Sequence, residues 1–166
     1  MVYSHLFGMK MYNLTATKLT ASQNARATLN RITDEVRCAK VVAVGSGNTN
    51  SFSVPTSTAE RGNALQISPT TDTNVYVRYF LDTTEQSLKR KASGNPKVEV
   101  IARFITNQIP FQVEDFTGQV LTNSQNNRVI RMTLEFNQYE FAKRSGTGGF
   151  YDYYRLQTKI SRRAID

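Results

Sequence analysis

Apolar side chains recur at helical spacing in the first quarter of the chain. They occupy Ala25, Leu29, Ile32, Val36 and Ala39. Steps of four, three, four and three residues place these side chains on one stripe of a helix. Between Val2 and Val44 there is no proline, and the one glycine is Gly8. We predict a helix over residues 1–44, roughly 60 Å long at about 1.5 Å per residue, whose first half projects from the domain and whose second half packs on a sheet.

After residue 50 the apolar period changes from helical to two, the period of half-buried strands. The clearest alternation runs through residues 75–82, 129–136 and 154–160. Shorter candidate strands cover residues 51–54, 64–68, 86–91, 98–105 and 109–116. The glycine-rich stretch 145–149 separates the two last long strands, which predicts an antiparallel hairpin.

These elements predict one domain of the α+β class. It comprises an N-terminal helix over residues 1–44 and an antiparallel β-domain over residues 45–166, with Gly45, Ser46 and Gly47 ending the helix. No later helix is expected, so crossover connections are absent and the sheet should be mainly antiparallel. One face of that sheet would bury the helical stripe.

The chain has 166 residues, a formal net charge of +8 and a sequence pI of about 9.8. This charge is compatible with an acidic partner, but the simpler interpretation is that it keeps the protein soluble. Cys38 is the single cysteine, which excludes an internal disulfide and a cysteine-based metal site; we expect it to be a small buried hydrophobe. No apolar run is long enough to cross a membrane.

Candidate chemistry is sparse. His5 is the only histidine, and a triad or a histidine-containing metal site would have to be built around it. Neighbouring Glu114 and Asp115 point to opposite faces of a strand and cannot share a site. We therefore expect no catalytic residue, no cofactor and no enzyme.

Oxygen-rich loops leave a calcium site open. The candidate ligands are Asp72, Asn74 and Asp82. Their spacing does not match an EF-hand, and we predict no metal from it.

One strand face combines aromatic and cationic side chains. Tyr151, Tyr153, Arg155 and Lys159 all occupy odd positions of the last strand, so they should share a face. Such a face can stack bases and hold phosphates, which makes a nucleic-acid-binding module the alternative function. A solvated strand face is the simpler interpretation.

The run from Ala25 to Ala39, ARATLNRITDEVRCA, resembles the distal part of the N-terminal helix of pilin-like proteins. It is most similar to minor pilins of type IV pili and to J-type minor pseudopilins of type II secretion. The segments 98–118 and 154–163 are also similar to strands of these families. The leader and membrane segment typical of them are not in the sequence, and we expect a soluble fragment that begins just past that segment.

The resemblance implies a pilin-like fold and a structural function. The chain would be a minor subunit that helps initiate or cap a filament, with Phe7, Met11 and Leu14 in subunit contacts. Its partners would be other pilin or pseudopilin subunits, through the N-terminal helix, and the membrane, through the missing upstream segment. The expected location is the cell envelope, anchored in the inner membrane, with the β-domain in the periplasm or outside the cell.

Overall fold

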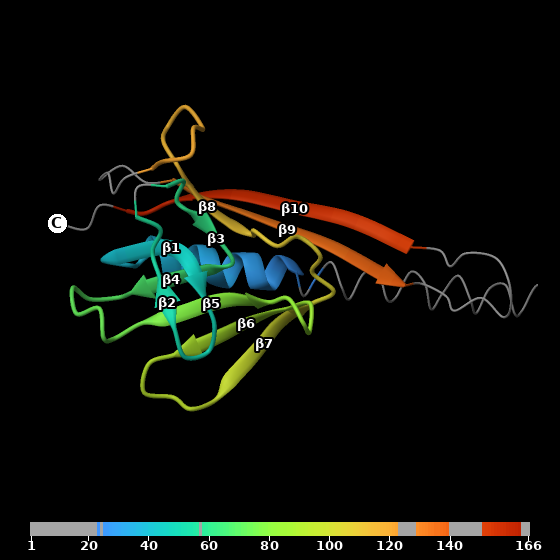
Figure 1. Cartoon of the computed structure of the whole chain (residues 1–166), viewed down its shortest axis with the longest axis horizontal. Helices are drawn as coiled ribbons and strands as arrows, with labels where there is room; N and C mark the ends of the chain where they lie inside the picture. Colours follow the sequence, from blue (N-terminus) through green and yellow to red (C-terminus); the bar gives the residue numbers. More distant parts are fainter. Residues whose placement is uncertain (1–22, 24, 57, 123–128, 140–150, 164–166) are drawn as a thin grey trace, which may run out of the picture.

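A computed structural model describes residues 23, 25–56, 58–122, 129–139 and 151–163 (Figure 1). The described part contains one helix of 13 residues, over residues 25–37, followed by strands. The strands are β1 (Val41–Gly47), β2 (Phe52–Ser53), β3 (Arg61–Gly62), β4 (Ala64–Ser68), β5 (Val77–Asp82), β6 (Ser87–Ala92), β7 (Val98–Arg103), β8 (Phe111–Glu114), β9 (Val129–Tyr139) and β10 (Tyr151–Ser161).

The strands form two antiparallel sheets. Six strands make the first sheet, in the order β2-β1-β4-β5-β6-β7, and four make the second, in the order β10-β9-β8-β3. Apolar side chains from both sheets meet in one core, to which the second sheet contributes Phe111, Met132 and Leu134, each fully buried. The two sheets therefore pack on each other, whereas the sequence analysis expected a single sheet.

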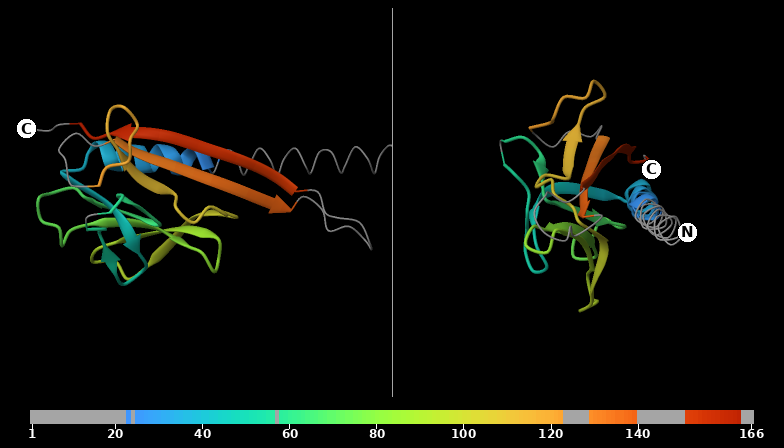
Figure 2. Two further views of the ribbon diagram at one scale, coloured as in Figure 1. Left: turned by 45° about the horizontal axis from the view of Figure 1, so that its top comes forward. Right: turned by 90° about the vertical axis from the view of Figure 1, so that its right-hand side faces the viewer.

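The helix lies along the seam between the two sheets, on one side of the molecule (Figures 1 and 2). Its inward stripe joins the common core: Ala25, Ile32 and Val36 are buried, and Leu29 is partly buried against the same cluster. Ala39 is buried too, although the helix has already ended. The opposite side of the helix is exposed.

The predicted fold class is wrong. The described residues do not form the expected helix over residues 1–44 packed on a single sheet, because the helix ends at residue 37 and most of the later residues form strands in two sheets. The error arises at Val41, Val42 and Val44, whose apolar spacing also fits a strand. As β-branched residues they suit a sheet, where Val42 pairs with Ile67 and Val44 with Leu65 of β4.

The predicted hairpin of the two last long strands is confirmed. Strands β9 and β10 pair antiparallel from Tyr151↔Tyr139 to Ser161↔Val129. The predicted strands at 64–68, 75–82, 86–91, 98–105 and 109–116 correspond to β4 through β8, within a few residues at their ends. Strands β1 and β3 were not predicted. Residues 1–22 and 145–149 lie outside the described residues.

The chain changes sheets at Asn63. Strand β3 belongs to the second sheet and β4 to the first, so Asn63, between them, lies where the sheets join. Its side chain takes the place of a paired strand residue: Oδ1 accepts from the Gly47 amide at 2.9 Å, while Nδ2 donates to the carbonyls of Gly47 at 2.9 Å and Leu81 at 3.1 Å. These bonds satisfy backbone groups that the break between β3 and β4 would leave unpaired.

A polar network ties the helix to the first sheet. The Glu35 carboxylate accepts hydrogen bonds from the Tyr79 hydroxyl and from the Arg90 guanidinium, both at 2.9 Å. Burial raises the pKa of the Tyr79 hydroxyl above its ordinary value, and the Glu35 carboxylate raises it further. Arg31 bridges Glu35 and Glu99 of β7 at 3.5 and 3.3 Å. The network orients the helix on the sheet, while the apolar stripe supplies the burial.

We expect Ile32→Asp to unfold the domain or detach the helix. Ile32 is fully buried, and removing such a side chain costs about 2–5 kcal/mol, to which an unpaired buried carboxylate adds a further penalty. Urea unfolding followed by circular dichroism measures the loss. Asn30→Asp, on the exposed side of the same helix, is the matched control and should change stability by less than about 0.5 kcal/mol. An unchanged urea midpoint for Ile32→Asp would contradict the packing.

We also expect Tyr79 to make the protein less stable at alkaline pH. Because its folded-state pKa is raised, the unfolded chain loses this proton first, near pH 10. Between that pH and the folded-state pKa the folded state binds more protons, so the free energy of unfolding falls by about 1.4 kcal/mol per pH unit. The Tyr79→Phe variant should lack this part of the decrease in the free energy of unfolding with pH. Urea unfolding of both proteins at several pH values above 9 measures the difference in slope, and equal slopes would refute the effect.

Candidate functional site

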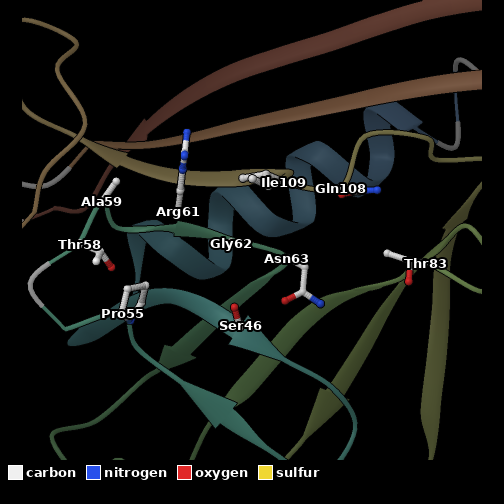
Figure 3. A pocket seen from close by; sticks show the side chains of 10 residues that line it. All are labelled: Ser46, Pro55, Thr58, Ala59, Arg61, Gly62, Asn63, Thr83, Gln108 and Ile109. Atoms are coloured by element: carbon white, nitrogen blue, oxygen red, sulfur yellow. The ribbon is translucent and has the colours of Figure 1, made fainter.

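A groove opens above the place where the two sheets join. It has a volume of about 710 Å³, within the roughly 300–1,000 Å³ typical of binding pockets. Its ten lining residues come from β1, the segment before β3, β3 and the residue after it, the β5–β6 turn and the segment before β8. They are Ser46, Pro55, Thr58, Ala59, Arg61, Gly62, Asn63, Thr83, Gln108 and Ile109. Figure 3 shows Arg61 and Ile109 on one side of the groove, with Pro55 and Ser46 on the other.

Beside the groove, two glycines allow a close approach of the backbones of β1 and β3. A Cβ on Gly62 would lie 2.0 Å from the carbonyl oxygen of Gly45, and a Cβ on Gly45 would lie 2.0 Å from that of Ser53. Real side chains do not tolerate such distances, so only bare backbone fits here. Sequence reasoning assigned Gly45 to a helix cap and did not single out Gly62.

The wall of the groove is mixed in character. Ile109 is 47% exposed, and with Pro55 and Ala59 it gives an apolar surface, while hydroxyl and amide side chains supply polar atoms. The Arg61 guanidinium is exposed and has no hydrogen-bond or ion-pair partner among the described residues. The groove can therefore hold an apolar group next to an anionic one. No signal in the sequence brings these residues together.

A second feature is the turn Asp115–Gln119, which follows β8. Asp115 Oδ1 accepts hydrogen bonds from the amide of Thr117 at 2.8 Å, from its hydroxyl at 2.7 Å and from the amide of Gln119 at 2.9 Å. The Thr117 hydroxyl and then the Gln119 amide lower the pKa of the Asp115 carboxyl. Gly118 adopts a φ of +95°, as a turn of this kind requires. The turn holds Phe116 outward, 91% exposed.

The base of this turn is secured by a buried carboxylate. Glu114 is fully buried, and its oxygens lie 2.8 Å from Arg131 Nε, 2.8 Å from Lys159 Nζ and 2.7 Å from Gln112 Nε2. One hydrogen bond, from Gln112, and the opposite charges of Arg131 and Lys159 offset part of the cost of burying this carboxylate. The expectation that Glu114 and Asp115 point to opposite faces of a strand does not apply, because β8 ends at Glu114 and Asp115 belongs to the turn.

The predicted nucleic-acid face is partly neutralised by acidic side chains. Tyr153, Arg155 and Lys159 are exposed on one side of β10. Arg155 pairs with Glu135 at 3.6 Å, however, and Lys159 pairs with Glu114 at 2.8 Å. The side chain of Tyr151 lies outside the described residues. Phosphates would have to compete with these carboxylates, so the arrangement does not favour the alternative function.

The other predicted site residues are dispersed. The Asp72 carboxylate caps the Asn74 amide at 2.9 Å, and Asp82 is held by Lys89 at 2.8 Å. Among the described residues no group of three or more His, Cys, Asp or Glu is placed to hold a metal.

Cys38 is exposed, not buried as predicted. His5, Phe7, Met11 and Leu14 lie outside the described residues.

Comparisons with protein families, with curated proteins and with solved structures find no match to this chain. No helix in the described ranges is both long and apolar enough to span a bilayer.

We expect Gly62→Ala to destabilise the protein by about 3 kcal/mol or more, because the new methyl group would force the two sheets apart at their junction. Gly94→Ala is the matched control. Its Cβ would have no neighbour within 4 Å, and only the φ of +75° opposes it, at a cost of about 1–2 kcal/mol. Chemical denaturation compares the two variants with the wild type, and a Gly62→Ala variant no less stable than the control would contradict the close approach.

Proposed function

We propose that this chain is a structural subunit that assembles into a filament, of the minor pilin or minor pseudopilin kind, and not an enzyme. In this proposal it helps to initiate or cap the filament of a type IV pilus or a type II secretion pseudopilus. It is held in the inner membrane through an upstream segment, with its β-domain in the periplasm or outside the cell, and its partners are other subunits of the same filament.

The observation that carries the proposal is the position of the helix 25–37. One stripe of it is buried between two sheets while the other side remains exposed at the edge of the molecule (Figure 2). A helix packed in this way can be approached by a neighbouring subunit without disturbing the core. The exposed side includes Arg26, Asn30 and Asp34, which suit polar contacts at the rim of an interface.

The sequence supports the same proposal independently. The run from Ala25 to Ala39, which resembles the distal helix of minor pilins and pseudopilins, contains the buried positions Ile32 and Val36. The proposal rests on this packed segment and on the resemblance. It does not depend on the longer helix and single sheet that the sequence analysis expected.

The test uses the full-length protein, tagged at its C-terminus, in the organism that produces it. Filaments are sheared from the cells, and the share of the protein in the filament fraction is measured. We expect Phe7→Ser, Met11→Ser and Leu14→Ser together to lower this share at least tenfold. Each large apolar side chain buried in a contact contributes roughly 1.5–3 kcal/mol, and about 1.4 kcal/mol corresponds to a factor of ten.

The control for this experiment is Val75→Ser, which changes an exposed apolar residue in the loop before β5 and should leave the filament share unchanged. Equal total amounts of protein in the cells exclude degradation as the cause. A triple variant that enters filaments as well as the wild type, or a wild-type protein absent from them, would refute the proposal.

A further inference from the structure

Phe116 is exposed in a way that folding does not explain. It is 91% exposed, so its ring contributes almost nothing to the core. The turn that presents it is nonetheless firmly built, with three hydrogen bonds on Asp115 Oδ1 and the buried Glu114 beneath. A rigid aromatic residue loses little conformational freedom on binding, and such residues are common anchors of protein interfaces.

The groove at the sheet junction offers a complementary surface. Its apolar side chains include Ile109, which is 47% exposed, and its Arg61 guanidinium has no partner in the described part of the chain. An aromatic ring in this groove would cover the apolar wall and could lie under the guanidinium, a favourable cation–π geometry. A carboxylate next to that ring would supply the missing counter-charge.

Phe116 and the groove cannot satisfy each other within one molecule, since Phe116 remains almost fully exposed. We propose that Phe116 of one copy of this chain inserts into the groove of a second copy, next to Ile109 and Arg61. Asp115 then brings its carboxylate to the neighbour's Arg61. The inference rests on the proposed filament function and adds to it a specific contact between β-domains.

This contact is open-ended. The projecting residue and the groove are different surfaces of the same chain, so each bound copy still presents one free Phe116 and one free groove. Such a heterologous contact generates a closed ring if the rotation between successive copies brings the last copy back to the first, and a filament if it does not. A subunit of this kind can extend an assembly through its β-domain as well as through its helix.

The test measures the mass of the full chain by sedimentation velocity and light scattering over a wide concentration range. About 0.15 M salt is used, because there the Debye length is about 8 Å and the repulsion between chains of charge +8 is screened. We expect the wild type to form species larger than a dimer. Phe116→Ser and Ile109→Arg should each raise the dissociation constant at least tenfold. Val75→Ser, at 46% exposure, is the matched control and should associate like the wild type.

Mixing the two variants gives the decisive result. Phe116→Ser keeps an intact groove, and Ile109→Arg keeps an intact Phe116. An equimolar mixture can therefore form one contact and no more, so a dimer of twice 18.7 kDa is expected. Thr58→Arg, at an exposed groove position, replaces Ile109→Arg if that variant does not fold.

Several outcomes would overturn the contact. They are a wild type that is monomeric at every concentration, variants that associate like the wild type, and a mixture that stays monomeric or forms long species. Binding of a thymidine oligonucleotide by a monomeric wild type, lost in Phe116→Ser, would assign the turn to nucleic acid instead. A failure here leaves the filament proposal standing, since that proposal is tested through Phe7, Met11 and Leu14.

Discussion

The structure depends on the close approach of two bare backbones at Gly45 and Gly62. A Cβ atom at position 62 would lie 2.0 Å from the Gly45 carbonyl oxygen. Strand β3 can therefore pass this close to β1 only because residue 62 is a glycine. The neighbouring Asn63 completes the junction by bonding both Gly47 and Leu81. The chain can therefore leave the second sheet and enter the first within one residue, which brings the two apolar faces together over a common core.

The helix 25–37 completes that core from the open side. Its apolar stripe stabilises the packing of the helix but does not fix its orientation, because hydrophobic contact is not directional. The hydrogen bonds that Glu35 accepts from Tyr79 and Arg90 fix the orientation of the helix on the first sheet. Since the Glu35 network lies at the rim of the core, the outer side of the helix is left to solvent and to neighbours.

The groove lies at the same junction, where Gly62 and Asn63 form part of its lining. The turn that follows β8 is held by Asp115 and exposes Phe116. The proposed function as an assembly subunit would require surfaces that remain uncovered in the folded monomer. The outer side of the helix, Ile109 in the groove and the ring of Phe116 are all exposed in the folded monomer.

The sequence alone determined the elements whose periodicity is local. The stripe through Ile32 and Val36 and the alternation of β9 and β10 follow from side-chain spacing along one segment. The tertiary structure decided where the helix ends, since residues 41–44 fit either period and form a strand by pairing with β4. It also decided that there are two sheets, and it brought Arg61 and Ile109 to one groove. Contacts between residues far apart in the chain leave no periodic trace in the sequence, which is why only the folded structure reveals them.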